Sequence, residues 1–199
     1  YINGVCEATG GVSNDSGSSS KVTIGIEDDG SSSPFDGYLQ DVRVYKGAAK
    51  YSGTTVGTQY FVVPATSPDI LPDTPSGVSG SSKLAKITDG AVTFDGSGDY
   101  LYIPPSSDWD FGTGAYTLEA FINTDGTGID QEIFDLGLDG THTTGNDIGF
   151  RFRIGTNDIL YAANHSGSSV VGQCYDTSSA PIGVGRWYHI AYVRDGNNF

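Results

Sequence analysis

The sequence has no methionine and little positive charge. Across 199 residues, 10 lysines and arginines stand against 24 aspartates and glutamates, which gives a formal net charge of −14. Nucleic acid is therefore not expected as a partner, because phosphate binding needs a basic surface. The sequence shows no signal peptide and no apolar run long enough to span a bilayer. We expect no membrane span, and we interpret the chain as a mature piece or a slice of something longer.

Cysteine is also scarce. Cys6 and Cys174 could form one disulfide, but two cysteines give no framework pattern that would support it. Both lie on or beside expected strands, where small buried thiols are common. The sequence leaves the bonded and the free state equally open.

Glycine and aromatic residues are abundant, with 29 Gly, 12 Tyr and 9 Phe. Short strand patterns recur between turn residues along the chain, which indicates a β-sandwich or barrel. The clearest pattern is residues 149–154, where Phe150, Phe152 and Ile154 alternate with two arginines and predict a half-buried strand. Only residues 46–51 could make a helical turn.

Three segments are distinguished by composition. Residues 64–87 contain Pro64, Pro68, Pro72 and Pro75 among Ser, Thr, Asp and Gly, which favours an extended, partly stiff linker. The linker separates two portions rich in strand patterns, residues 1–63 and 88–199. Each portion is expected to supply part of a jelly roll.

The last strand pattern, residues 186–193, is largely apolar on both faces, so we expect it to be covered on both sides. Asp195-Gly196 then provides a hairpin turn, but few residues follow it. Residues 1–5 read as an interrupted strand and are a candidate for the missing partner. That partner could come from the same chain, a neighbouring subunit or the next repeat of a longer polypeptide.

Four motifs resemble the successive signatures of laminin-G-like domains, which belong to the concanavalin A-like lectin/glucanase superfamily. They are Phe94-Asp-Gly-Ser-Gly-Asp-Tyr100, Tyr116-Thr-Leu-Glu-Ala-Phe121, Arg186-Trp-Tyr-His-Ile-Ala191 and Phe35-Asp-Gly-Tyr-Leu-Gln-Asp-Val-Arg-Val-Tyr45. Residues 67–77 also resemble repeats in tail-fibre-type proteins of marine phages. The resemblance implies an all-β, two-sheet antiparallel jelly-roll sandwich. Since the family's closing strand, residues 35–45, comes first here, the jelly roll is circularly permuted as written.

The superfamily includes glucanases, so we examined the sequence for a pair of catalytic carboxylates. Retaining glycosidases hold two carboxyl groups about 5–5.5 Å apart. Glu132 and Asp135 are three residues apart in one strand pattern, which predicts that they face opposite sides of the sheet. Other acidic residues lie in expected loops, and His189 fits a packed, hydrogen-bonded histidine. We therefore predict that the protein is not an enzyme.

Several residues are candidates for binding. The lectin resemblance implies that exposed aromatics could stack on sugars, although Trp109 could equally pack beneath its loop. Oxygen-bearing side chains in residues 135–147 suit calcium, but their spacing matches no defined motif and ordinary turn formation remains open. The candidates are Trp109 and Tyr161 for carbohydrate, Asp139, Asn146 and Asp147 for calcium, and Asn14 and Asn164 as glycosylation acceptors.

These observations favour a non-enzymatic structural or adhesive repeat unit of an extracellular filament or virion fibre. In this interpretation neighbouring copies are the main partner, and jelly rolls are joined by the linker or by strand exchange. A carbohydrate-binding, lectin-like module with glycans as partners is the alternative, and a glycoside hydrolase is a third hypothesis. The expected location is extracellular or on a virion surface.

Overall fold

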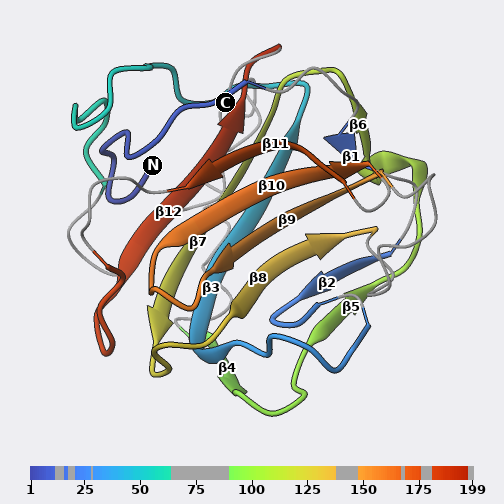
Figure 1. Cartoon of the computed structure of the whole chain (residues 1–199), viewed down its shortest axis with the longest axis vertical. Helices are drawn as coiled ribbons and strands as arrows, with labels where there is room; N and C mark the ends of the chain where they lie inside the picture. The colour runs from blue at the N-terminus through green and yellow to red at the C-terminus, as the bar shows by residue number, and fades with distance from the viewer. Residues whose placement is uncertain are drawn as a thin grey trace, which may run out of the picture.

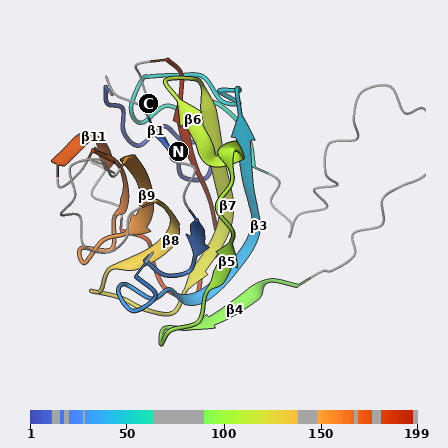
Figure 2. The same cartoon turned by 90° about the vertical axis from the view of Figure 1, so that its right-hand side faces the viewer.

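The computed structural model describes residues 1–11, 16–17, 21–27, 29–63, 90–137, 148–166, 169–175 and 181–196. Two antiparallel sheets pack face to face, as Figures 1 and 2 show from perpendicular directions. Over these residues there is no α-helix, and the one helical element is a 3₁₀ turn, η1 (Ser107–Trp109). The expected all-β sandwich is confirmed.

The first sheet has six strands in the order β11-β10-β9-β8-β2-β5 and the second has four in the order β12-β7-β3-β4. The strands of the first are β2 (Val22–Ile24), β5 (Leu101–Ile103), β8 (Gln131–Leu136), β9 (Ile148–Ile154), β10 (Leu160–Ser166) and β11 (Ser169–Tyr175). The second holds β3 (Asp36–Lys46), β4 (Val92–Asp95), β7 (Tyr116–Thr124) and β12 (Tyr188–Arg194), and β1 (Ser16–Gly17) pairs with β6 (Asp110–Gly112).

Alternating side chains build the core between the two sheets. On β9, Phe150, Phe152 and Ile154 are buried as the alternation predicts, and they face apolar residues of β7 and β12. Tyr192 of β12 lies 4.8 Å from Phe150 between ring centroids. Every second residue of each strand points the other way, so each sheet also has an outer face. The two polar clusters described below lie on these outer faces.

Residues 1–3 pair with the outer edge of β12. Tyr1 and Ala191 exchange two backbone hydrogen bonds, of 2.7 Å and 2.9 Å, and the Asn3 amide donates to the His189 carbonyl at 2.7 Å. Ile2 forms an antiparallel bridge with Ile190. The prediction that the start of the sequence supplies a partner for β12 is thus confirmed, and in this structure the partner belongs to the same chain.

Two local expectations are wrong. Residues 46–51 do not form a helical turn, because Lys46 ends β3 and Gly47 turns the chain with a φ of +82°. The pattern at 186–193 is not covered on both faces throughout, since Trp187 is 46% exposed while the side chains from His189 to Val193 are buried. Other residues of the domain therefore bury the outer face of this strand from His189 onward and leave Trp187 exposed.

Candidate functional sites on the two outer faces

A β-bulge in β8 changes which residues share a face of the six-stranded sheet. Glu132 pairs with Arg153, whereas Phe134 pairs with Phe152, so Ile133 is an extra residue in β8. The expectation that Glu132 and Asp135 face opposite sides is therefore wrong. The bulge shifts the alternation by one position, and both carboxyl groups lie on the outer face beside Arg151.

Arg151 is the centre of a buried acidic cluster. Its Nη1 lies 2.6 Å from Glu27 Oε1, its Nη2 3.3 Å from Asp135 Oδ2 and its Nε 3.5 Å from Glu132 Oε2. One guanidinium group thus forms ion pairs with three carboxyl groups. Glu132 and Asp135 are fully buried, and over the described part of the chain neither oxygen of Glu132 has a hydrogen-bond partner.

Burial is the main reason that the pKa of Glu132 is raised well above its ordinary value. The charge of Arg151 opposes this shift of the pKa, and the neighbouring Asp135 adds to it. A loop lies along the edge of this part of β8, because the Glu132 amide donates to the Ser33 carbonyl at 2.8 Å. The cluster is closed from solvent, so its carboxyl groups do not form an open acid–base pair.

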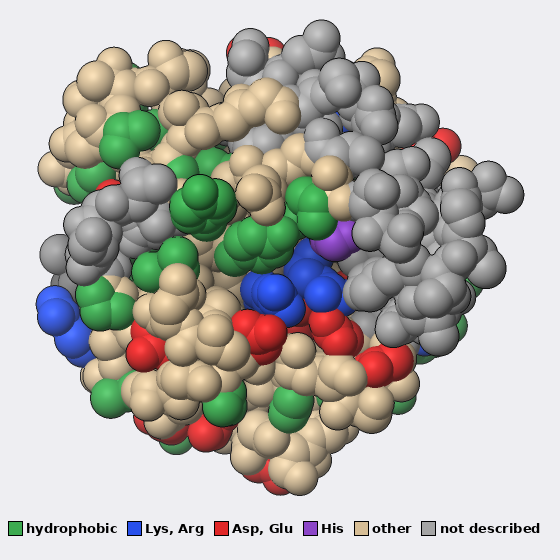
Figure 3. All heavy atoms as spheres, viewed as in Figure 1, with side chains coloured by type: hydrophobic (Ala, Val, Ile, Leu, Met, Phe, Trp, Pro, Cys, Tyr) green, Lys and Arg blue, Asp and Glu red, His purple; other side chains and the backbone are tan. Residues whose placement is uncertain are grey.

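A polar and aromatic row crosses the same outer face. The strand registers place Tyr175, Tyr161, Arg153 and Glu132 side by side on β11, β10, β9 and β8. Figure 3 shows this face, with arginine side chains beside acidic ones near its middle and apolar side chains beyond them. One candidate from the sequence, Tyr161, therefore lies next to charged groups.

A hollow of about 390 Å³ opens beside this row, which is within the size range of small-ligand sites. Arg153 Nη1 lies 3.1 Å from Asp130 Oδ2, and Asp130 Oδ1 accepts a 3.0 Å hydrogen bond from the Thr156 amide. The Arg153 guanidinium lies 5.2 Å from the centroid of the Tyr161 ring. The hollow is lined by Asp130, Arg153, Gly155, Thr156, Asn157, Ile159, Tyr161 and Tyr175.

The hollow offers both kinds of contact that a polyhydroxylated ligand needs. Tyr161 and Tyr175 provide ring surface, and the Arg153–Asp130 pair provides donors and acceptors. Burial raises the pKa of Tyr161. Its hydroxyl lies 3.4 Å from Gln173 Oε1.

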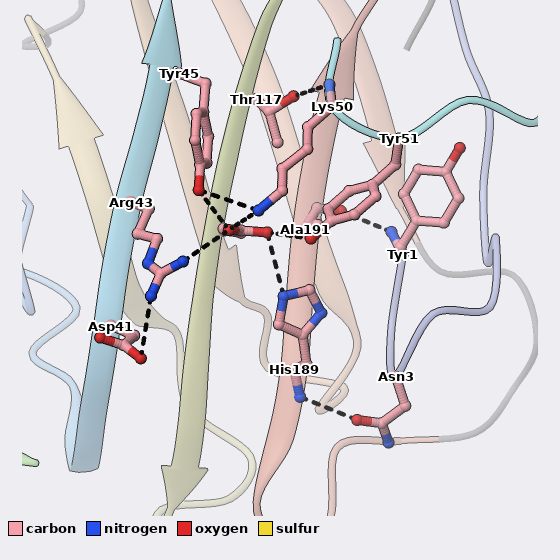
Figure 4. Close-up of polar contacts among 11 residues, drawn as sticks. Tyr1, Asn3, Asp41, Arg43, Tyr45, Lys50, Tyr51, Thr117, His189 and Ala191 are labelled. Carbon is pink, nitrogen blue, oxygen red and sulfur yellow. Dashed lines mark hydrogen bonds and ion pairs between the residues drawn. The ribbon is translucent and has the colours of Figure 1, made fainter. Parts of the chain in front are cut away.

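A second polar cluster lies on the outer face of the four-stranded sheet and is centred on Glu119 of β7 (Figure 4). The Glu119 carboxylate accepts hydrogen bonds from Lys50 Nζ at 2.8 Å, from the Tyr45 hydroxyl at 3.1 Å and from the Tyr51 hydroxyl. His189 Nε2 lies 3.4 Å from Glu119 Oε2. The expectation of a packed His189 is confirmed.

Burial alone would raise the pKa of Glu119, but hydrogen bonds from His189, Lys50 and Tyr51 lower it to about 2. An aromatic cover lies beside the cluster. Tyr51 stacks on Phe61 with ring centroids 3.8 Å apart, and both rings meet His189 edge-on. Contacts of this cluster therefore hold residues 47–63 against β7 and β12. The sequence analysis did not identify Glu119 as a candidate. Its position as the one carboxylate within the apolar strand pattern of β7 could have indicated a buried polar contact.

A family model of the laminin-G type, described as the concanavalin A-like lectin/glucanases superfamily, matches residues 95–199. The matched segment is more than half of the 199 residues. The chain belongs to the concanavalin A-like lectin/glucanase superfamily. No curated protein and no solved structure matches it.

The matched part of this concanavalin A-like domain does not contain all of its strands. β2 and β3 precede residue 95, yet β2 lies between β8 and β5 in one sheet and β3 lies between β7 and β4 in the other. Each sheet is thus completed by a strand from the first part of the chain. This arrangement is the one expected of a permuted jelly roll.

The remaining candidates of this concanavalin A-like domain are dispersed. Trp109 is half-buried and meets Phe134 edge-on at 6.5 Å, so it packs on the margin of the core. Asn164 is fully buried and its amide donates to the Tyr192 hydroxyl at 3.1 Å, which leaves no room for a glycan in the folded domain. The candidates Asn14, Asp139, Asn146 and Asp147 lie outside the described residues.

Three further observations concern ligands and the cysteines. In the part of the chain that the structure describes, no group of three or more His, Cys, Asp or Glu side chains could hold a metal ion. No helix within the same residues is long and apolar enough to cross a membrane. Cys6 and Cys174 form no disulfide with each other, and burial raises the pKa of Cys6.

Proposed function

We propose that this domain is a non-catalytic structural and adhesive unit of an extracellular filament or virion fibre, in which jelly rolls are joined in series. The observation that carries the proposal is the register of residues 1–3 on β12. In this proposal, residues 1–63 of one copy attach to the sandwich of the next, and we call this contact the joint. Residues 1–3 pair with β12 there, and residues 47–63 contact Glu119 and His189.

The register is the one that a continuous hairpin would have. A two-residue turn at Asp195-Gly196 would pair residue 194 with residue 197 and residue 192 with residue 199. A following residue would then lie opposite Ala191, and this is the position that Tyr1 occupies. Gly196 has a φ of +61°, a left-handed value that glycine adopts readily in turns. The pairing is therefore compatible with Tyr1 following a residue 199 of a preceding copy.

The same contacts can form within one chain or between copies. An element that is exchanged between identical protomers makes identical contacts in both arrangements. Residues 64–89 can reach up to ~85 Å when extended, whereas a compact domain of this size is only ~40 Å across. Chain length therefore allows residues 1–63 to complete either their own sandwich or a neighbouring one.

A disulfide trap tests the joint in the full chain. Tyr1→Cys with Ala191→Cys, in a Cys6→Ser/Cys174→Ser background, places two thiols at positions that exchange both backbone hydrogen bonds. Facing Cα atoms of this kind lie ~5.5 Å apart, close enough for a disulfide. Joining in series predicts a ladder of covalent multimers on a non-reducing gel.

The matched control is Tyr161→Cys with Tyr175→Cys, which face each other on β10 and β11 and always belong to the same chain. This pair should give monomers only. If the Tyr1/Ala191 pair also gives only monomers at every protein concentration, the proposed joining of copies is wrong.

A second candidate function is carbohydrate binding, and the hollow beside Tyr161 favours it. It combines ring surface with a charged donor–acceptor pair, as carbohydrate sites require. Glycan-array binding that is lost in Tyr161→Ala and retained in Trp109→Phe would support this function. Unchanged binding in Tyr161→Ala would remove the hollow as its site.

A further inference from the structure

Asn3 and Gly4 form a two-residue turn beside β12. The Ile2 amide donates to the Val5 carbonyl and the Val5 amide donates back to the Ile2 carbonyl, each at 3.0 Å. Both turn residues have left-handed backbone angles, with a φ of +51° at Asn3 and +85° at Gly4. A hairpin turn with positive φ at both central positions favours the sequence Asn-Gly. The fold therefore favours this pair here, and no other Asn in the chain is followed by Gly.

Close packing on the other side of the turn requires the glycine. A Cβ atom placed on Gly4 would lie 2.0 Å from the Phe61 carbonyl oxygen, which no side chain can tolerate. The Gly4 carbonyl also accepts a 2.9 Å hydrogen bond from the Tyr60 amide. The contacts that hold residues 60–61 against the turn thus keep an asparagine directly before a glycine.

An asparagine followed by glycine has an intrinsic reactivity. The backbone nitrogen of the glycine can attack the asparagine Cγ, because the glycine has no side chain to hinder the approach. The new N–Cγ bond forms as the bond from Cγ to Nδ2 breaks. Ammonia leaves with the proton of the attacking amide, and a succinimide ring remains. Water then opens the ring at either carbonyl and gives aspartate or isoaspartate, so the reaction needs no reagent other than water.

The contacts of Asn3 with β12 oppose this reaction, although the residue is exposed to water (Figure 4). Asn3 Oδ1 accepts a 2.9 Å hydrogen bond from the His189 amide, and the Asn3 amide donates to the His189 carbonyl at 2.7 Å. Ring closure needs the Gly4 nitrogen and the Asn3 Cγ on the same side of the Cα–C bond of Asn3. A left-handed residue turns the following nitrogen away from its own side chain. Attack therefore requires the turn to leave β12.

The two products differ in how they fit the site. Aspartate at position 3 keeps an acceptor oxygen for the His189 amide and tolerates the left-handed conformation. Isoaspartate instead carries the main chain through its side-chain carbons and lengthens the turn by one methylene group. The lengthened chain cannot keep both the pairing of Ile2 with Val5 and the 3.0 Å hydrogen bond from the Cys6 amide to the Thr58 carbonyl. Only the isoaspartate product therefore loses the register on β12.

We propose that Asn3 is a deamidation site that makes detachment of residues 1–6 from β12 permanent. While the turn is attached, its conformation protects Asn3. Once the turn is detached, the Gly4 nitrogen attacks Asn3, and a chain that acquires isoaspartate cannot attach again. The proposal goes beyond the structural role proposed above, and it holds whether residues 1–6 pair with β12 of their own chain or of another copy.

Peptide mapping by mass spectrometry measures the reaction in the full chain at pH 8. Deamidation of Asn3 should be slower by about tenfold or more in the folded protein than in the same chain unfolded in urea, because the folded rate scales with the fraction of molecules in which the turn is detached. Isoaspartate should appear among the products. Equal rates in the two states, or no reaction at Asn3 in urea, would overturn the proposal.

A matched pair of variants separates detachment of the turn from unfolding of the whole domain. Ile2 and Ile154 are both buried in the core, so Ile2→Val and Ile154→Val make the same chemical change. Ile2→Val weakens the anchor of the turn and should speed the deamidation of Asn3 severalfold. Ile154→Val lies on β9 and should leave the rate unchanged. If both variants speed the reaction equally, Asn3 responds to global unfolding and the proposed role of detachment is wrong.

Hydrogen exchange at the Ala191 amide reports whether the turn is attached, since this amide donates to the Tyr1 carbonyl at 2.9 Å. Chains with isoaspartate at position 3, returned from urea to buffer, should exchange this amide faster by about tenfold or more than unmodified chains treated alike. Asn3→Asp should keep the natural protection, because its turn has no extra methylene group. Natural protection in the isoaspartate chains would show that the change is not permanent and would contradict the proposal.

Discussion

Lys50 and Glu119 are 69 residues apart in the sequence, and the Lys50 ammonium donates a 2.8 Å hydrogen bond to the Glu119 carboxylate. Glu119 is almost fully buried, whereas the Lys50 side chain is 29% exposed. The pair connects residues 47–63 with the central strand β7. It therefore contributes to holding the first part of the chain on the second.

Replacing Glu119 by glutamine should destabilise the domain by about 2 kcal/mol, because it removes a carboxylate that Lys50 and His189 share. The expected cost is below that of a fully buried ion pair since Lys50 is partly solvated. Urea unfolding at pH 7 measures it. Asp108→Asn, an exposed carboxylate in η1, is the matched control and should change the free energy of unfolding by less than about 0.5 kcal/mol. Equal effects of the two changes would contradict the prediction.

The same carboxylate should set part of the response to acid. The pKa of Glu119 is lowered from 4.5 to about 2 in the folded protein, so the unfolded chain binds the proton more tightly. Its contribution to stability is fully present above pH 4.5 and is lost as the pH falls toward 2. The difference in free energy of unfolding between the natural chain and Glu119→Gln should shrink over this interval. A difference that stays constant from pH 6 to pH 2.5 would show that Glu119 is not the group responsible.

Glu132 should give a pH dependence of the opposite sign. Its pKa is raised in the folded state, so folding takes up a proton and stability falls as the pH rises above the unfolded value of 4.5. Glu132→Gln removes this titration and should become more stable, relative to the natural chain, as the pH is raised from 4.5 to 8. Thermal midpoints measured across this range test the sign. A relative stability that falls with pH would contradict it.

We expect no glycoside hydrolase activity, although Glu132 and Asp135 share a face. Both carboxyl groups are fully buried around Arg151, and a glycosidase needs its two carboxyl groups beside the scissile bond. Assays with a panel of aryl glycosides and soluble β-glucans should therefore show no turnover. Turnover that is abolished by Glu132→Gln or by Asp135→Asn, in a variant that remains folded, would refute this expectation.

Sequence patterns predicted the sandwich because period-two alternation is a local property. The alternation on β9 identified the core side of Phe150 and Phe152 correctly. Pairing between β12 and residues 1–3 was also predictable, since an apolar strand and a turn without a following strand are both visible in the sequence. These successes rest on nearest neighbours in the chain and on the need to pair a strand edge.

The sites were less predictable because they depend on contacts between distant residues. The cluster at Glu119 unites side chains from β3, the segment after it, β7 and β12, and no local pattern joins these positions. Trp187 carried the pattern of a covered strand, but the cover ends at His189. Tyr161 was identified from its type alone, and its partners Arg153 and Asp130 emerged only from the register of β9 and the loop before β8.

Ile133, the extra residue in β8, also connects this strand with the neighbouring loop. Ile133 resets the parity of the strand, so that Glu132 and Asp135 project to one side. Its carbonyl accepts from the Gly25 amide, and the Glu132 amide donates to Ser33, so backbone groups freed by the irregularity anchor the neighbouring loop. Deleting this one residue would leave a regular pairing in which Glu132, Phe134 and Asp135 keep their partners Arg153, Phe152 and Arg151. It would, however, remove the carbonyl that accepts from Gly25, so the role of the extra residue is to hold that loop.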